Sequence, residues 1–507
     1  MQYKIFAAID IGSYEVEMKI FELSRAKGMR EIDSIRQRLE LGKEAYTAGK
    51  ISVEKIESLC ILLQSFREIM KGYQVDAYRA CATSAVRETK NRVILLDYIE
   101  KKTGLKIEVL SNSEQRFLDY KSIASSENEF NKIIQKGTAI VDVGGGSIQV
   151  SLFDKDSLIS TQNIRIGTLR IRERLASLEK NVTHMEKMIE ELVNSELAGF
   201  KKMYLKEREI KNLIVIGDNF RETAKVPSMT REEFMEFYRL VTEYSADEAA
   251  EKLDVSAENI YMLVPSLIIY RRFIEECDVE TIWMPGFHLS DGIAYEYAQK
   301  NKIIKAGHNF EADIIASARN MAKRYMCGKN HIRAIEELSL MIFDRTKKLH
   351  GLDARKRLLL QIAAILHGCG KYISLSDVAE CSYSIIMATE IIGLSHAERE
   401  IIANIVRYNT QELDYYENVG GIMENMTKDD YLVIARLTAI LRIANALDRS
   451  HLQKFKNVKI ELKDAELVIH VETPEDISLE LGLFPDKADF FQEVFSVRPV
   501  IKRKKVR

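Results

Sequence analysis

The clearest apolar pattern in the chain lies at residues 138–153, TAIVDVGGGSIQVSLF. An apolar run from Ala139 to Val143 stops at a glycine triplet, after which apolar residues alternate with polar ones through Leu152. This pattern predicts two strands joined by a tight turn. Because glycine has no Cβ, the N–H groups of such a turn can approach an anion closely. An ordinary hairpin fits this segment equally well when the segment is taken alone.

The N-terminus repeats the pattern. Residues 5–9 form an apolar run that ends in Asp10, and Gly12 and Ser13 precede a second alternating stretch. Asp142 holds the same place as Asp10, about 130 residues further along the chain. The repeat predicts two related halves that face one phosphate site. Each half offers a loop of N–H donors and a carboxylate that can hold a hydrated divalent cation.

Between the two hairpins, strand and helix patterns alternate. Apolar spacing predicts a helix over 52–70 and strands over 78–82 and 106–110. Arg87 and Glu114 each follow a strand at the start of a helix, and the carboxyl ends of strands are where open α/β sheets bind ligands. Ordinary helix starts explain both residues as well, so this pattern leaves the two interpretations open.

Later in the chain the periodicity changes. Pro265 is expected to open a helix, and apolar spacing is helical throughout 309–452. The pattern of residues 458–471 predicts a hairpin, and the pattern of residues 486–494 predicts a helix. The basic tail, residues 502–507, is expected to be solvated rather than bound to a polyanion.

These patterns divide the chain into four expected domains. Two α/β domains cover 1–125 and 126–305, an all-α domain covers 306–455, and a small α/β cap covers 456–507. A chain of 507 residues has room for this number, since domains commonly hold ~100 to 200 residues.

Composition excludes some classes of partner. The 74 basic and 76 acidic residues give a net charge of −2, which predicts no general attraction to DNA or to a membrane surface. The longest apolar stretch, 431–447, contains Arg436 and Arg442, so no membrane span is expected. The six cysteines are scattered without a CxxC spacing. Reduced thiols and the absence of a signal pattern at the start of the sequence predict a cytoplasmic protein.

Several motifs, taken in order, resemble the exopolyphosphatase and guanosine pentaphosphate phosphohydrolase (Ppx/GppA) family. The resemblance implies two actin-like, ribonuclease H-like domains with a cleft between them, followed by an HD-like helical domain, and it covers at least residues 5–455. The matching segments are AAIDIGS (7–13), RLELGK (38–43), ATSAVRETKN (82–91), SEQR (113–116), VDVGGGSIQVSLF (141–153), IGT (166–168) and LLLQIAAILHGCGKYIS (358–374).

The resemblance implies hydrolysis of a terminal phosphoanhydride with Mg²⁺ or Mn²⁺ in the cleft. The water-activating glutamate of the family falls on Glu114, anchored by Arg116. Its metal-associated positions fall on Asp10, Asp142 and Gln149. Its phosphate-binding positions fall on Gly12, Ser13, Arg87, Gly144, Gly145, Gly146 and Ser147.

Two of these positions depart from the family pattern. Gln149 replaces a glutamate, so an amide that can position water supplies no charge to a cation. Tyr14 stands where the family has asparagine, which removes a phosphate contact. Both changes predict weaker metal binding and lower activity.

The helical domain resembles a metal-binding HD-type fold but lacks one ligand. His331, His367 and Asp448 are present, whereas Gly368 stands where a carboxylate is needed, so no second metal centre is expected here. The domain is instead expected to extend the substrate channel or to form a homodimer. Candidate residues for a polyphosphate track are Arg355, Lys356 and Arg357.

The leading hypothesis is a phosphohydrolase acting on inorganic polyphosphate or on pppGpp. A second hypothesis is a binding or regulatory protein that uses the same cleft without turnover. A sugar kinase is disfavoured, because residues 217–220 do not form a glycine-rich adenosine-binding loop.

Overall fold

The computed structural model describes residues 3–124, 127–155, 157–176, 185–205, 208–216, 220–305, 307–418 and 426–504. The chain divides into two compact units, Met1–Asp313 and Ile314–Arg507. Both sheets that carry the predicted glycine turns belong to the first unit.

The first sheet has the strand order β3-β2-β1-β4-β5. Strand β1 is antiparallel to β2 and parallel to β4. The strands are β1 (Lys4–Ile11), β2 (Glu15–Ser24), β3 (Gly28–Arg38), β4 (Ala77–Ala82) and β5 (Ile107–Val109). The helices that follow them are α1 (Leu41–Thr47), α2 (Val53–Gly72), α3 (Ser84–Glu88), α4 (Arg92–Thr103) and α5 (Asn112–Ala124).

Helix α2 confirms the predicted helix over 52–70. The Ser52 side chain accepts a hydrogen bond from the backbone N–H of Lys55, which satisfies one of the free donors at the helix start. Leu59, Leu63 and Phe66 are buried one helical turn apart in the core of this sheet. The apolar stripe read from the sequence is therefore the face that packs.

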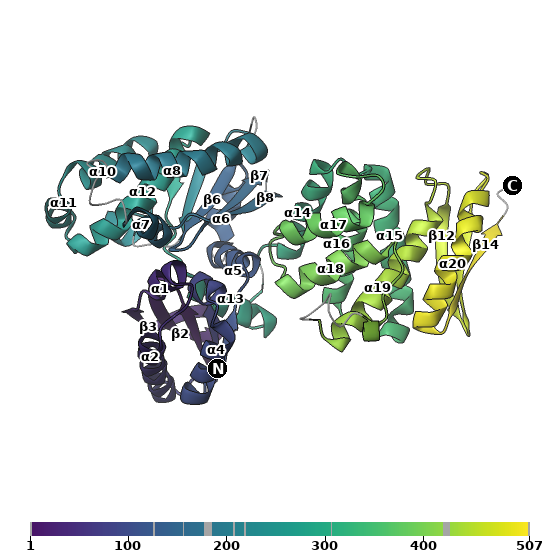
Figure 1. Ribbon diagram of the computed structural model, residues 1–507, viewed down its shortest axis with the longest axis horizontal. Helices are drawn as coiled ribbons and strands as arrows, with labels where there is room; N and C mark the ends of the chain where they lie inside the picture. The colour runs from purple at the N-terminus through teal and green to yellow at the C-terminus, as the bar shows by residue number, and fades with distance from the viewer. Residues whose placement is uncertain are drawn as a thin grey trace. The chain divides into compact units, whose positions relative to one another are not determined.

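The second sheet has the order β10-β11-β9-β6-β7-β8. Figure 1 shows helices α8, α10 and α12 beside this sheet. Its strands are β6 (Thr138–Val143), β7 (Ile148–Asp154), β8 (Ser157–Ile164), β9 (Asn212–Ile216), β10 (Ser228–Thr230) and β11 (Thr281–Trp283). Its helices are α6 (Glu127–Ile133), α7 (Thr168–Ala176), α8 (Met185–Phe200), α9 (Phe220–Ala224), α10 (Arg231–Glu243), α11 (Ala246–Leu253) and α12 (Ala257–Cys277).

The two sheets contain the same hairpin. In β1–β2 Asp10 pairs with Glu17, and in β6–β7 Asp142 pairs with Gln149, seven residues later in both cases. Each turn is closed by a 3.0 Å hydrogen bond from the first glycine N–H, Gly12 to the Glu15 carbonyl and Gly144 to the Ser147 carbonyl. The shared pairing and turn support the inference of two related halves.

The chain returns to the first sheet through helix α13 (Leu289–Lys300). Leu289 and Ile293 share a core with Phe6 and Ala8 of β1. This helix thus lies with the first sheet, although the sequence pattern assigns it to the range 126–305. Helix α13 also packs on α5, so it supports the helix that carries Glu114.

We expect Gly292→Ala to destabilise the first unit by about 3 kcal/mol, because overpacking against rigid backbone cannot relax. A Cβ on Gly292 would lie 2.1 Å from the Leu118 carbonyl oxygen of α5. Urea unfolding measures the loss. Gly199→Ala in α8 is the matched control, since its Cβ would meet only Met203 Cε at 3.9 Å. Equal stability of the two variants would contradict this account of the packing.

The second unit confirms the predicted helical region. Helix α14 (Phe310–Arg324) crosses from the first unit into the second. The following helices are α15 (Lys329–His350), α16 (Ala354–Leu366), α17 (Val378–Ala388), α18 (His396–Tyr408) and α19 (Lys428–Leu447). A sheet of order β12-β13-β14 and a helix α20 follow. Their bounds are β12 (Lys456–Lys463), β13 (Glu466–Glu472), α20 (Ser478–Phe495) and β14 (Arg498–Lys504).

Two helices begin earlier than the sequence predicts, and each has a proline inside it. Pro265, expected to open a helix, lies within α12, which begins at Ala257. The helix predicted over 486–494 is α20, which begins at Ser478 and contains Pro485. The predicted helix starts at Pro265 and at 486 were therefore wrong. A proline removes one backbone donor, but buried side chains on both sides of it keep the helix packed.

The basic tail is partly structured. Residues 498–504 form β14, which pairs in parallel with β13 from Glu466 to Glu472. The side chains of Lys502 and Arg503 are exposed, as expected of a solvated tail, although their backbone belongs to β14; residues 505–507 lie outside the described residues. Within the described ranges, no helix is both long and apolar enough to cross a bilayer.

Candidate functional site

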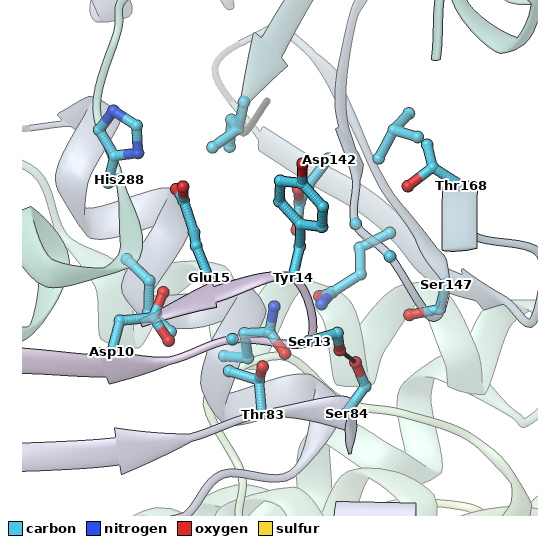
Figure 2. A pocket seen from close by; sticks show the side chains of 18 of the residues that line it. Asp10, Ser13, Tyr14, Glu15, Thr83, Ser84, Asp142, Ser147, Thr168 and His288 are labelled. Atoms are coloured by element: carbon cyan, nitrogen blue, oxygen red, sulfur yellow. Dashed lines mark hydrogen bonds between the residues drawn. The ribbon is translucent and has the colours of Figure 1, made fainter. Parts of the chain in front are cut away.

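Both glycine turns open onto one pocket in the first unit. Figure 2 shows side chains from the two hairpins around it, with Asp10 and Ser13 from one and Asp142 and Ser147 from the other. Eight of the predicted site residues line this pocket, so the structure brings most of the predicted set together. They are Asp10, Gly12, Ser13, Asp142, Gly144, Gly145, Ser147 and Gln149.

The second glycine turn is held by the start of helix α7. The Thr168 N–H donates to the Gly144 carbonyl at 3.0 Å, and the Arg170 N–H donates to the Gly145 carbonyl at 3.1 Å. The Arg170 guanidinium donates to the Gly146 carbonyl at 2.9 Å. These bonds fix the direction of the loop carbonyls, which leaves the N–H groups of the loop as donors for an anion.

Three hydroxyl groups lie beside the first turn. Ser13 Oγ is 2.7 Å from Tyr46 Oη and 2.8 Å from Ser84 Oγ, and the latter two atoms are 2.8 Å apart. Figure 2 shows the contact between Ser13 and Ser84. Gly146 faces this group, since a Cβ there would be 2.3 Å from Tyr46 Oη. The two turns therefore approach each other closely only because residue 146 has no side chain.

The pocket is strongly acidic. Four carboxylates line it, Asp10, Glu15, Asp119 and Asp142, whereas none of the described lining residues is a lysine or an arginine. Burial, followed by the carboxylates Glu17, Glu15 and Asp142, raises the pKa of Asp10 well above its usual range. Burial, followed by Asp142 and Asp10, does the same to the pKa of Asp119. A polyanion entering this pocket needs a counter-charge.

A hydrated divalent cation fits the residues present. Asp10 Oδ1 is buried without a hydrogen-bond partner among the described residues, and Asp142 lines the same pocket. Within the described residues, no group of three or more His, Cys, Asp or Glu side chains is arranged to enclose a metal ion. Mg²⁺ needs no such cage, because it keeps several waters and uses one or two carboxylates together with substrate phosphate oxygens.

Glu114 does not line the pocket. Its carboxylate accepts hydrogen bonds from the Ser111 N–H at 3.0 Å and from Ser111 Oγ at 2.7 Å, and its own N–H donates to Ser111 Oγ. This reciprocal arrangement is a capping box, which satisfies donors at the start of α5. The catalytic role of Glu114 stays a prediction, and the structure adds that its carboxylate also serves the start of α5.

Two neighbours of Glu114 on α5 line the pocket instead. Gln115 and Asp119 both contribute to its wall, and Asp119 is 4% exposed. The sequence analysis missed them. The available signal was an aspartate at position 119 among apolar residues of a helix that follows a strand end, one turn after Gln115.

Arg87 also lies outside the pocket lining. Its guanidinium donates to the Leu110 carbonyl oxygen at 2.6 Å, where it joins α3 to the segment after β5. Phosphate binding by Arg87 stays a prediction. Tyr14 does line the pocket, and the guanidinium of Arg38 lies 4.9 Å from its ring centre.

In the second unit, the residues that resemble an HD site come together. His331 Nδ1 lies 2.7 Å from Asp448 Oδ2, and His331 Nε2 lies 3.0 Å from His367 Nε2. The candidate polyphosphate-track arginines form ion pairs, Arg355 with Glu398 and Arg357 with Asp344. Their N–O distances are 2.6 and 2.8 Å.

We expect the second unit to lose stability in acid. Burial, with His331 beside it, lowers the pKa of His367 from 6.5 to about 3. The unfolded chain therefore binds more protons below pH 6.5, so stability falls as the pH drops toward 3. Between pH 6.5 and 5 the loss from this group is about 2 kcal/mol. Urea unfolding of the full chain measures the loss, and His367→Gln is expected to reduce its pH dependence. If the unfolding free energy of His367→Gln changed with pH as steeply as that of wild type, the acid loss could not be assigned to His367.

Comparisons with known proteins agree with the sequence motifs. A model of the Ppx/GppA phosphatase family matches residues 20–301, and a model of Ppx/GppA phosphatase, domain III, matches residues 315–484. A guanosine-5'-triphosphate,3'-diphosphate pyrophosphatase of Photobacterium profundum is 20% identical over 426 residues, which are 81% of this chain and 81% of that protein.

Two solved structures share the fold. An exopolyphosphatase of Cytophaga hutchinsonii is 18% identical and covers 60% of this chain and 100% of its own, with a TM-score of 0.51. An exopolyphosphatase-like protein is 17% identical, with the same coverage and TM-score. Together with the two mixed sheets, these structures fit an actin-like fold.

Residues 217–219, on which the argument against a sugar kinase partly rests, lie outside the described residues.

Proposed function

Because the chain belongs to the Ppx/GppA phosphatase family, we propose that it releases the terminal phosphate of inorganic polyphosphate, and of pppGpp, in the pocket between its two hairpins. One observation carries the proposal: Asp10 and Asp142, each beside a glycine turn, line a single pocket. Two of the similar proteins are named for these two substrates.

The residues of the turns bind and orient the terminal phosphate. The N–H groups of Gly145 and Gly146 and the hydroxyls of Ser13 and Ser147 are donors to its oxygens. The cavity, of about 170 Å³, is smaller than a site for a whole nucleotide, so it takes the end of a phosphate chain. Asp10 and Asp142 would hold Mg²⁺ or Mn²⁺, which would neutralise charge on the phosphate oxygens during transfer.

Phosphate release tests the proposal. The purified full chain is incubated with Mg²⁺ or Mn²⁺ and with medium-chain polyphosphate, pppGpp or ATP, and orthophosphate is measured over time. We expect release from polyphosphate or pppGpp and loss of release in EDTA, since the pocket lacks a lysine or arginine among its described lining residues. Undiminished release in EDTA would contradict the cation requirement.

A second candidate is a binding or regulatory protein that uses the same pocket. Two amides favour it, because Gln115 and Gln149 line the pocket without adding charge. Calorimetric binding of polyphosphate or pppGpp without any release of orthophosphate would establish this candidate in place of the hydrolase.

We expect Gln149→Glu to lower the half-activating Mg²⁺ concentration by about tenfold, because a carboxylate paired with Asp142 adds attraction for the cation. Phosphate release across an Mg²⁺ titration measures the shift. Gln162→Glu on β8 is the matched control, because Gln162 is not among the residues that line the pocket. An unchanged midpoint would place residue 149 outside the influence of the cation.

The proposal extends to the second unit, for which we propose an HD-like fold without its own metal centre and a role in homodimer formation. The match of residues 315–484 to domain III of the family supports the relationship of the second unit to that family. Light scattering of the full chain measures the assembly, and a monomeric mass at micromolar concentration would contradict the dimer.

A further inference from the structure

Two side chains on one face of α5 present unsatisfied acceptors to the pocket. Gln115 and Asp119 both line it, and they are four residues apart on the helix. Gln115 Oε1 and Asp119 Oδ2 are buried without a hydrogen-bond partner among the described residues. A buried polar atom of this kind normally has a partner, so each atom indicates a missing donor.

The two side chains do not satisfy each other's oxygens in the structure, because neither Gln115 Oε1 nor Asp119 Oδ2 has a partner among the described residues, although the Gln115 amide nitrogen is itself a donor. Side chains four residues apart on a helix lie about 5 to 6 Å from each other at Cβ, which leaves room for one water between their ends. A water placed there donates one hydrogen to each oxygen. Its lone pairs then face away from the helix, toward the pocket.

We propose that Gln115 and Asp119 hold the attacking water and that Asp119 accepts its proton. This inference rests on the proposed hydrolase function. The water oxygen forms a bond to the terminal phosphorus while the bond from phosphorus to the bridging oxygen breaks. The electron pair of the broken bond stays on the shortened phosphate chain, and the water proton passes to Asp119 Oδ2. The products are orthophosphate and a chain one phosphate shorter.

The other carboxylates near the pocket are placed for different tasks. Glu114 is engaged by Ser111 in the capping box. Asp10 and Asp142 stand directly before the glycine turns, where the cation and the phosphate meet. Glu15 lines the pocket at the start of β2, and no amide acceptor lies one helical turn from it. Asp142 also has an amide beside it, Gln149 on the paired strand, but Asp142 and Gln149 flank the glycine turn, whereas Asp119 and Gln115 share one face of a helix.

Helix α5 is fixed in rotation, which keeps both acceptors aimed at the pocket. Lys121 on α5 donates to Glu296 of α13 at 2.9 Å, and both side chains are buried. Gly292 of α13 contacts the backbone of α5 so closely that a Cβ would lie 2.1 Å from the Leu118 carbonyl oxygen. A side chain that must place a reacting water benefits from such a rigid support.

The first test compares Asp119→Asn with Asp97→Asn. Asn keeps the shape of the side chain but cannot take a proton, so we expect kcat of Asp119→Asn to fall by about 100-fold or more with KM unchanged within about threefold. Asp97 lies on α4 in an exposed ion pair with Lys101, outside the residues that line the pocket, so Asp97→Asn is expected to keep kcat within about threefold of wild type. Circular dichroism and thermal unfolding establish that both variants are folded.

The second test moves the proton acceptor. Gln115→Leu removes one of the two hydrogen-bond acceptors for the water and is expected to lower kcat by about tenfold while Asp119 is intact. The double variant Asp119→Asn, Gln115→Glu returns a carboxylate to the neighbouring place on the same helix face. We expect it to recover at least about tenfold of the activity lost in Asp119→Asn. A purely structural role of Asp119 predicts no such recovery.

The outcomes distinguish a failure of the Asp119 assignment from a failure of the hydrolase function. If wild type releases phosphate and folded Asp119→Asn does so at a similar rate, the inference on Asp119 is overturned and the hydrolase function stands. A large loss of kcat in Glu15→Gln or Glu114→Gln, with Asp119→Asn near normal, also overturns it. If wild type binds polyphosphate and pppGpp but releases phosphate from neither, the hydrolase function and this inference are both overturned.

Discussion

Asp142→Asn is expected to reduce Mg²⁺-dependent phosphate release by about 1,000-fold, since a bound cation contributes several kcal/mol of charge stabilisation in phosphoryl transfer. Asp142 is the next-to-last residue of β6, separated by one residue from the glycine triplet, and lines the pocket. Asp10→Asn is expected to have a similar effect, because Asp10 holds the equivalent place in the first hairpin. Steady-state kinetics across an Mg²⁺ titration measures both.

The matched control is Asp154→Asn. Asp154 ends β7, the partner strand of β6, and is not among the residues that line the pocket. Its substitution is expected to leave the rate and the Mg²⁺ midpoint unchanged. If Asp142→Asn and Asp154→Asn had equal rates, the two turn carboxylates would have no role in holding a cation.

Gly167→Ala is expected to lower kcat/KM by about 100-fold, because a displacement of about 1 Å in a positioning group has an effect of this size. A Cβ on Gly167 would lie 2.5 Å from the Gly144 carbonyl oxygen and from the Gly145 carbonyl carbon. These are backbone atoms of the turn, so the turn itself must move. The hydrogen bonds from α7 to the loop carbonyls would be displaced with it.

Thermal unfolding and kinetics of the same preparation distinguish a moved turn from an unfolded protein. Gly72→Ala at the end of α2 is the control, because a Cβ there meets nothing within 4 Å. We expect the melting temperature of Gly167→Ala to stay above the assay temperature. A normal kcat/KM would mean that phosphate binding does not depend on the position of this loop.

The sequence predicted the hairpins well because their pattern is local. Alternation and glycine identify strand, turn and strand within about 16 residues, and the equivalence of Asp10 and Asp142 follows from the repeat alone. The shared pocket then depends on only one further fact, that the halves face each other. Helix α2 could be predicted equally well, because its cap and its apolar stripe both lie within one continuous segment of the sequence.

The sequence did not predict which residues of α5 face the pocket. Glu114, Gln115 and Asp119 are all polar residues near the start of one helix, and a rotation of about 100° per residue decides which of them points inward. That rotation is set by the packing of α13, which lies some 170 residues later in the chain. The sequence showed that Glu114 could serve the helix start or a ligand, but it did not show that Gln115 and Asp119 line the pocket.

The starts of α12 and α20 were misjudged for a related reason. A proline is a probable helix boundary when only the backbone is considered. In α12 and α20 the apolar side chains before and after the proline are buried in one core. Tertiary packing therefore outweighed the local preference, which a sequence pattern does not reveal.

The acidic lining of the pocket has a consequence for selectivity. Under the proposed function, we expect a chain of phosphates that arrives without counter-ions to be repelled by the ionised carboxylates of the pocket, and the same chain carrying Mg²⁺ to be attracted. The protein would then distinguish two ionic forms of one solute. The supply of free magnesium, and not only the amount of phosphate polymer, would govern how much of the polymer the protein engages.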